Sequence, residues 1–229
     1  MTTSGSIDFT LTARQVVTFA LRKLGVTAGS ETPAPEDSDQ ALEELNMMLK
    51  GMQKSGPMIF TVRTDGTKAL TAATAAHVLT TEKPLRLLEV RYSDTNDREI
   101  PMTEMTRTEY WELPEKTSSG VPTNYWYDDN GQGFTIYVWP VKATVTTETI
   151  EFTYIRRIED IDDLANTLDI PNEWLDTVGY NLAERLISTF GVKGERAARI
   201  EAKAAQLWQQ AKDYDREDIV TMVPERRYG

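Results

Sequence analysis

Apolar side chains recur every three to four residues in the first part of the chain, which is the spacing of one helix face. Residues 12–24 follow this period, and their apolar face consists of Val16, Val17, Ala20, Leu21 and Leu24. Thr12 and Gln15 have the spacing of a capping box, and Gly25 stands where a left-handed C-terminal cap is expected. The pattern therefore predicts a helix over residues 12–24.

A second helical period begins near Pro35 or Glu36. Acidic side chains fill its first turn, where they suit the positive end of the helix dipole. Its apolar stripe consists of Leu42, Leu45, Met48, Leu49 and Met52. Gly56 and Pro57 end this pattern and, with it, the second predicted helix.

From Met58 to about Ile158 the sequence favours strands, because β-branched and aromatic residues lie between turn signals. The predicted strands are residues 58–63, 86–92, 124–128, 134–139 and 147–157. Asn130 and Gly131 are the favoured pair for a tight turn, and they predict a β-hairpin. A short helix at residues 106–113 is expected to interrupt the strands.

The helical period returns after Pro171. Residues 174–190 are apolar over more than half of the helix circumference, so this helix is expected to be buried on two sides. The last predicted helix covers residues 195–214, and its apolar positions form a narrow packing seam.

Together these elements predict an α+β fold. Residues 1–57 and 170–215 are expected to form one four-helix bundle, because neither pair of helices can bury its apolar stripes alone. Residues 58–169 are then an inserted antiparallel β-rich region, and residues 216–229 an extended C-terminal arm.

Composition narrows the possible functions. The 229 residues include 36 acidic and 25 basic side chains, a net charge of -11, and they show no basic stripe typical of nucleic-acid binding. Cysteine is absent, which excludes disulfides, thiolate zinc sites and thiol catalysis. No apolar run approaches the roughly 18 residues of a membrane span, and no signal-peptide pattern is present, so a cytoplasm-like compartment is expected.

Two acidic patterns have the residue types of a metal site. Residues 128–133 resemble the opening of an EF-hand loop, but the twelfth position holds Trp139 instead of a glutamate. The acidic run Glu159, Asp160, Asp162 and Asp163 has groups that could bind a divalent cation or act in hydrolysis. A hairpin turn and a solvated acidic surface are the favoured interpretations, since neighbouring carboxylates point in different directions.

The remaining candidates favour no enzyme and no cofactor. His77 lies in an Ala- and Thr-rich stretch and is predicted to be at the surface. Phosphate-binding loops, zinc-binding helices and nucleophile elbows are absent from the sequence. The hairpin aromatics are predicted to divide between core and subunit contacts, rather than to bind sugars or bases. These aromatics are Tyr125, Trp126, Tyr127, Tyr137 and Trp139.

Several sequence segments resemble a known family. They are Ala20-Leu-Arg-Lys-Leu-Gly25, residues 39–50, Ile170-Pro-Asn-Glu-Trp174, Asn181-Leu-Ala183 and the Ala-rich residues 197–211. In this order and spacing the chain resembles the head-to-tail adaptor proteins of tailed bacteriophages, which are portal-binding tail accessory or head-completion factors. The long β-rich middle is more similar to the tubular-tail branch than to the compact helical members.

The resemblance implies a homo-oligomeric ring, typically of about twelve copies, that assembles under the portal protein. Such a ring extends the DNA channel, lets DNA pass without specific binding, and provides the attachment site for a downstream tail or nozzle protein. It would assemble in the host cytoplasm and act in the neck or tail of the virion. The alternatives are a tail terminator, a tubular tail protein or, less favoured, a cell-wall hydrolase that uses the acidic run.

The C-terminal arm is the predicted partner-binding segment, because its apolar side chains follow no helical period and have nowhere to be buried within the arm. Its expected binding residues are Ile219, Val220, Met222, Val223, Arg226, Arg227 and Tyr228.

Overall fold

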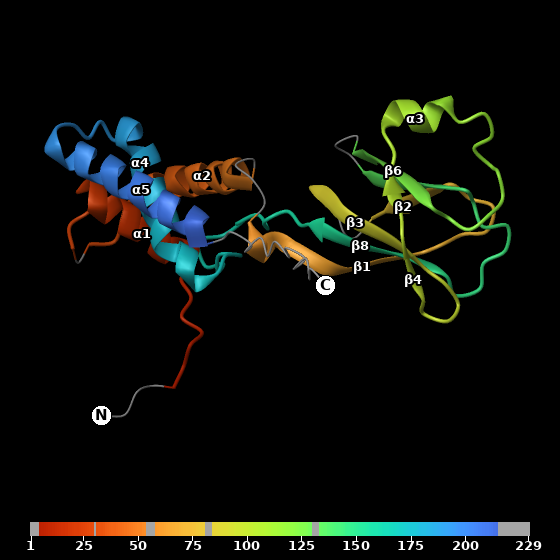
Figure 1. Cartoon of the computed structure of the whole chain (residues 1–229). Helices are drawn as coiled ribbons and strands as arrows, with labels where there is room; N and C mark the ends of the chain where they lie inside the picture. Colours follow the sequence, from red (N-terminus) through yellow and green to blue (C-terminus); the bar gives the residue numbers. More distant parts are fainter. Residues whose placement is uncertain (1–4, 30, 54–57, 81–83, 130–132, 215–229) are drawn as a thin grey trace, which may run out of the picture. The chain divides into compact units, whose positions relative to one another are not determined.

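The computed structural model describes residues 5–29, 31–53, 58–80, 84–129 and 133–214. The chain divides into two compact units, one of Met1–Phe60 with Ile158–Gly229 and the other of Thr61–Arg157. They are called the helical unit and the β unit below, and Figure 1 labels their elements. Within the described ranges, no helix combines the length and apolar character needed to cross a membrane.

The helical unit contains α1 (Ala13–Leu24), α2 (Pro35–Met52), α4 (Leu175–Thr189) and α5 (Glu195–Tyr214). Both predicted caps of α1 are present: Thr12 and Gln15 form a capping box, and Gly25 adopts a left-handed conformation with φ of 77°. The helices predicted at these four positions are therefore confirmed, with α5 matching its expected bounds.

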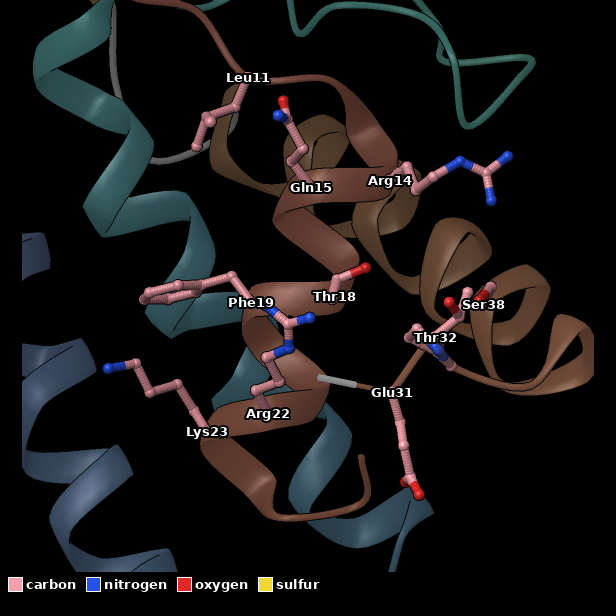
Figure 2. A pocket seen from close by; sticks show the side chains of 11 residues that line it. Leu11, Arg14, Gln15, Thr18, Phe19, Arg22, Lys23, Glu31, Thr32 and Ser38 are labelled. Carbon is pink, nitrogen blue, oxygen red and sulfur yellow. The ribbon is translucent and has the colours of Figure 1, made fainter. Parts of the chain in front are cut away.

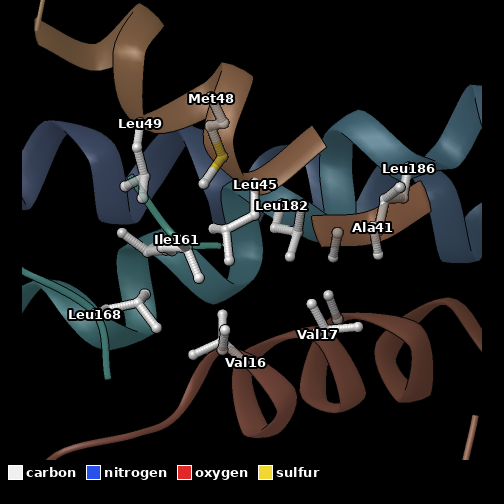
Figure 3. Close-up of a cluster of buried hydrophobic side chains, with 14 of the residues drawn as sticks. Val16, Val17, Ala41, Leu45, Met48, Leu49, Ile161, Leu168, Leu182 and Leu186 are labelled. Carbon is white, nitrogen blue, oxygen red and sulfur yellow. The ribbon is translucent and has the colours of Figure 1, made fainter. Parts of the chain in front are cut away.

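The core of the helical unit joins side chains from both ends of the chain. Figure 3 shows Val16 and Val17 of α1 facing Leu45 of α2 and Leu182 of α4. Leu45 and Leu182 are completely buried. α4 packs against α1, α2 and α5, which explains why so much of its circumference is apolar.

Residues 158–174 complete this core and cap the N-terminus of α1; they are irregular up to Pro171 and end in a short 3-10 helix, Asn172–Trp174. Ile158, Ile161 and Leu168 contribute buried side chains to the helical core. The first free backbone N–H groups of α1 donate to this segment, from Ala13 to the Asn166 carbonyl and from Arg14 to the Leu164 carbonyl, each at 2.8 Å. The segment therefore packs as part of the helical unit.

Asn46 of α2 fixes the same segment with two hydrogen bonds. Its Nδ2 donates to the Ile161 carbonyl at 2.9 Å, and its Oδ1 accepts from the Ile161 N–H at 3.0 Å. Lys50 adds an ion pair with Asp160 at 2.7 Å. Irregular backbone needs such side-chain partners, because it lacks the regular hydrogen bonds of a helix or sheet.

The β unit has two four-stranded sheets. The first has the order β1 (Val62–Ala69), β8 (Thr149–Ile155), β3 (Arg86–Ser93) and β4 (Glu99–Pro101), with every pair antiparallel. The second has the order β2 (Ala76–Leu79), β7 (Phe134–Trp139), β6 (Asn124–Asp129) and β5 (Thr103–Glu104). α3 (Arg107–Glu112) connects β5 to β6, which run parallel.

One apolar core joins the two sheets. Phe152 and Ile150 of β8 lie in the same buried cluster as Ile136 and Val138 of β7. The β6–β7 hairpin has the register Asp129↔Phe134, which confirms the predicted hairpin, although its turn lies outside the described residues.

The predicted fold class is wrong in its architecture. The described residues form five α-helices and two four-stranded sheets, instead of a four-helix bundle with an antiparallel insertion. Residues 158–174 share the helical core, and α3 forms a crossover that allows the parallel β5–β6 pair. The expected extended C-terminal tail lies outside the described residues.

Two further corrections concern the β unit. The strand predicted at residues 58–63 is mostly a 3-10 turn, Ile59–Thr61, and β1 starts only at Val62. His77 is buried rather than at the surface, with 3% of its area exposed. It lies in β2, where alternate side chains face the core, and burial lowers the pKa of its imidazole.

Glu148 is a buried carboxylate just before β8, with 5% of its area exposed. Its Oε2 accepts hydrogen bonds from the backbone N–H groups of Thr146 at 2.7 Å and Thr147 at 3.2 Å. The Lys142 ammonium lies 3.4 Å from Oε1. Backbone N–H donors, and then Lys142, hold the pKa of Glu148 at about 2.

We therefore expect Glu148 to make the β unit sensitive to acid. Its folded pKa lies below the ordinary value of 4.5, so its stabilising contribution is complete above about pH 4.5 and disappears as the pH falls toward 2. Glu148→Gln should lower the unfolding temperature at pH 7 and change it much less near pH 2.5. Thermal unfolding of both proteins at the two pH values tests this, and a difference that does not depend on pH would contradict it.

Candidate interaction surfaces

The outer face of α1 forms the floor of a cavity of about 710 Å³, which we call the α1 groove. Figure 2 shows Arg14 and Arg22 on α1 with Thr32 and Ser38 on the same side of the helix, whereas the Phe19 ring points to the other side. Its lining residues are Leu11, Arg14, Gln15, Thr18, Phe19, Arg22, Lys23, Glu31, Thr32, Pro33 and Ser38.

The groove is basic because α1 has three cationic side chains, Arg14, Arg22 and Lys23, and no acidic one. The Lys23 ammonium lies over the rings of Phe19 at 4.8 Å and Tyr180 at 5.2 Å. Arg14 and Arg22 are exposed and make no ion pair with any described residue. In a chain with surplus carboxylates, two unpaired arginines in one cavity favour an acidic partner.

A smaller cavity of about 250 Å³, the apolar pocket, adjoins the groove and shares Leu11 and Phe19 with it. Val16, Leu175 and Gly179 also line it. A Cβ at Gly179 would lie 2.8 Å from Phe19, so glycine is what lets this ring lie against α4. The pocket combines mostly apolar walls with two polar residues, Asn172 and Asp176, a composition that suits an apolar or aromatic group.

The β unit has an aromatic surface of the opposite charge at α3. The buried Tyr110 packs on Trp126 and Tyr137, with ring centroids 5.3 Å and 5.2 Å away. The next residue, Trp111, projects outward and is 55% exposed. A single-turn helix on a sheet can bury only one of two adjacent aromatics, so Trp111 is the side chain left for a partner.

Trp111 lies beside two exposed acids, Glu112 and Glu115, and we call these three residues the α3 surface. Neither acid forms an ion pair with a described residue. The Lys116 ammonium instead donates to the carbonyls of Trp111 and Leu113 at 3.1 Å and 3.2 Å, and lies 5.3 Å from the Trp111 ring. Trp111 is therefore held in place by its own loop.

The structure divides the predicted hairpin aromatics between two faces. Tyr125 belongs to the core between the sheets, whereas Trp126, Tyr137 and Trp139 pack with α3. Trp111 was not predicted as an interaction residue. The adjacent Tyr110-Trp111 pair in a short helix indicates that one of the two aromatic side chains is exposed. The groove residues were also missed.

The acidic run, the EF-hand-like turn and the C-terminal arm were the other predicted sites. In the acidic run, Asp160 pairs with Lys50, and Asp163 accepts a hydrogen bond from the Ala165 N–H at 2.7 Å. Across the described part of the chain, no three His, Asp or Glu residues converge on a possible metal site. All the predicted binding residues of the C-terminal arm, and part of the EF-hand-like turn, lie outside the described residues.

Comparison with known proteins identifies a family for the chain. The family model described as "SU10 adaptor protein" matches residues 11–228, which confirms the resemblance to phage adaptor proteins. No curated protein matches the chain. A solved structure described as "Neck of empty GTA particle computed with C6 symmetry" is 13% identical, with 85% of this chain and 93% of that chain covered. Its TM-score is 0.28, which is too low to support an argument.

Proposed function

The chain belongs to the SU10 adaptor protein family, and we propose that it is a structural protein of the phage neck that forms a ring under the portal. The ring, of about twelve copies, extends the DNA channel and presents an attachment site to the next tail protein. The observation that carries this proposal is the family match over residues 11–228, which includes both units.

The unpaired surfaces of the two units support an assembled state. Among the described residues Arg14 and Arg22 form no ion pair, and Trp111 is more than half exposed beside the packed rings of Tyr110 and Trp126. Exposed tryptophan and arginine are the residues most often found at the energetic centre of protein interfaces. These exposed side chains are more readily explained in a protein that binds partners than in one that acts as a monomer.

The net charge of -11 suits a channel through which DNA slides. Each lysine or arginine contact with a phosphate strengthens DNA binding, so a lumen rich in such contacts would hold the genome. In our proposal carboxylates outnumber basic groups on the lumen, and the cations of the α1 groove face protein. The particle is assembled in the host cytoplasm, and the protein stays in the virion neck.

Electron microscopy of the purified protein, alone and mixed with purified portal, tests this function. We expect a closed ring on one end of the portal, coaxial with its channel. Portal particles without added density would contradict the proposal. Binding to tail tubes instead of portal would favour the tail-terminator alternative.

We propose that the C-terminal arm, with Ile219, Val220, Met222, Val223, Arg226, Arg227 and Tyr228, binds the portal or a neighbouring copy. Deletion of all residues after Asp218 should leave the circular dichroism spectrum and unfolding temperature unchanged, because both described cores end before this point. Affinity for portal should fall at least tenfold, as measured by sedimentation with portal rings. An unchanged affinity would show that the arm has no such role.

A further inference from the structure

The α1 groove and the α3 surface have opposite charge, and one has an apolar pocket where the other has an exposed aromatic side chain. The groove has the cations Arg14 and Arg22 and the α3 surface has the anions Glu112 and Glu115, none of which forms an ion pair with another described residue. The groove opens onto an apolar pocket of about 250 Å³, and the α3 surface has a projecting indole. Each surface thus has the groups that the other lacks.

From this match we propose that the α3 surface of one copy docks in the α1 groove of a second copy. The Trp111 indole enters the apolar pocket between Phe19 and Leu175, while Glu112 and Glu115 face Arg14 and Arg22. This inference rests on the proposed ring and names the contact that closes it. Because the two surfaces differ, the contact is head-to-tail, which is the type that generates rings.

The energetics favour Trp111 as the anchor. Indole burial removes a large apolar area from water, and a side chain already held by Lys116 and by an edge-to-face contact with Tyr110 loses little freedom on binding. The charged groups act mainly on orientation and choice of partner, since exposed ion pairs contribute little affinity by themselves.

A second copy fits the groove better than DNA does. Phosphates are suitable partners for Arg14 and Arg22, but a duplex has no projecting apolar group for the pocket beside them. Glu31 in the groove and Asp176 in the pocket repel phosphates and carboxylates alike, so the apolar pocket, and not charge, distinguishes the two partners. An acidic protein surface with one projecting aromatic side chain can contact both the arginines of the groove and the apolar pocket.

Charge reversal in full-length protein tests the contact. One variant has Arg14→Glu with Arg22→Glu, and the other has Glu112→Arg with Glu115→Arg. Each alone should lose ring formation on purified portal at least tenfold, since its groove and α3 surface then have the same sign. An equimolar mixture should recover ring formation, because the two variants can alternate around an even-numbered ring. Glu43→Arg with Glu201→Arg, at exposed positions outside both surfaces, is the matched control for reversed acids.

A disulfide trap gives an independent measurement that does not depend on reversed charges. The chain has no cysteine, so Arg22→Cys and Glu112→Cys each introduce a single thiol. On portal rings, oxidation of the mixed variants should yield dimers with one copy of each. Trp111→Ala should lower ring formation at least tenfold, and Trp111→Phe should lower it less.

The outcomes separate this contact from the ring itself. If wild-type protein forms no ring on portal, the proposed function fails. If wild type forms rings but the reversed variants also do, or their mixture does not recover and no mixed disulfide forms, the contact is wrong and the ring stands. A disulfide that forms within a single chain carrying both Arg22→Cys and Glu112→Cys, with no dimer from the mixed single variants, would likewise overturn docking between copies. So would loss of duplex DNA binding in place of ring formation.

Discussion

Leu182→Asp should prevent the helical unit from folding. Leu182 is completely buried in α4, where it shares one core with side chains of α1 and α2. A buried carboxylate without a partner costs several kcal/mol, which approaches the roughly 5 to 15 kcal/mol that stabilises a typical domain. Far-ultraviolet circular dichroism should show a large loss of helical signal at pH 7.

Leu182→Met is the matched control, because it keeps the volume and apolar character of the site and should cost less than about 1.5 kcal/mol. Partial refolding of the Leu182→Asp protein at low pH, where the carboxyl is neutral, would support charge burial as the cause. If Leu182→Asp unfolds at the same temperature as Leu182→Met, the shared helical core is not as described.

The helices were predictable because their signals are local. The period of α1, its capping box at Thr12 and its left-handed Gly25 all lie within a short stretch of sequence. The apolar circumference of α4 likewise predicted burial on two sides, and three other helices pack around it. Helix signals of this kind need no knowledge of distant residues.

The strands could be predicted only where β-branched and aromatic residues gather clearly between turn signals. β6 and β7 have aromatic and β-branched residues on both sides of a turn signal, and their pairing was predicted correctly. β1 has Gly66 and polar residues, with a shift in register beside the glycine, so its sequence lacks a strand pattern. His77 was misplaced because β2 is short and its burial comes from pairing with β7, which is distant in sequence.

The candidate surfaces depend on tertiary structure more than the helices and strands do. Arg14, Arg22 and Lys23 are, by sequence alone, the solvated face of an amphipathic helix. They become a groove because residues 31–38 form its other side, and Phe19 meets Gly179 of α4. No local pattern places residues 19 and 179 together, so the apolar pocket could not be predicted from the sequence.

Substitution of Gly66 should destabilise the β unit strongly. A Cβ built at this position lies 2.3 Å from Cε2 of the Phe152 ring and 2.8 Å from the Phe152 carbonyl oxygen. Phe152 is completely buried and pairs with Gly66 across β1 and β8, so neither its ring nor its backbone has room to move. Gly66→Ala should therefore cost about 1 to 3 kcal/mol or more, as overpacking does.

The matched control is Gly133→Ala, because a Cβ at Gly133 meets nothing within 4 Å and should change stability little. Urea unfolding of both variants, followed by tryptophan fluorescence, measures the difference. The clash also predicts coupling: Gly66→Ala should cost less in a Phe152→Leu background, where a smaller side chain leaves space for the new methyl group. Equal costs in the two backgrounds would mean that the ring of Phe152 is not what excludes a side chain at position 66.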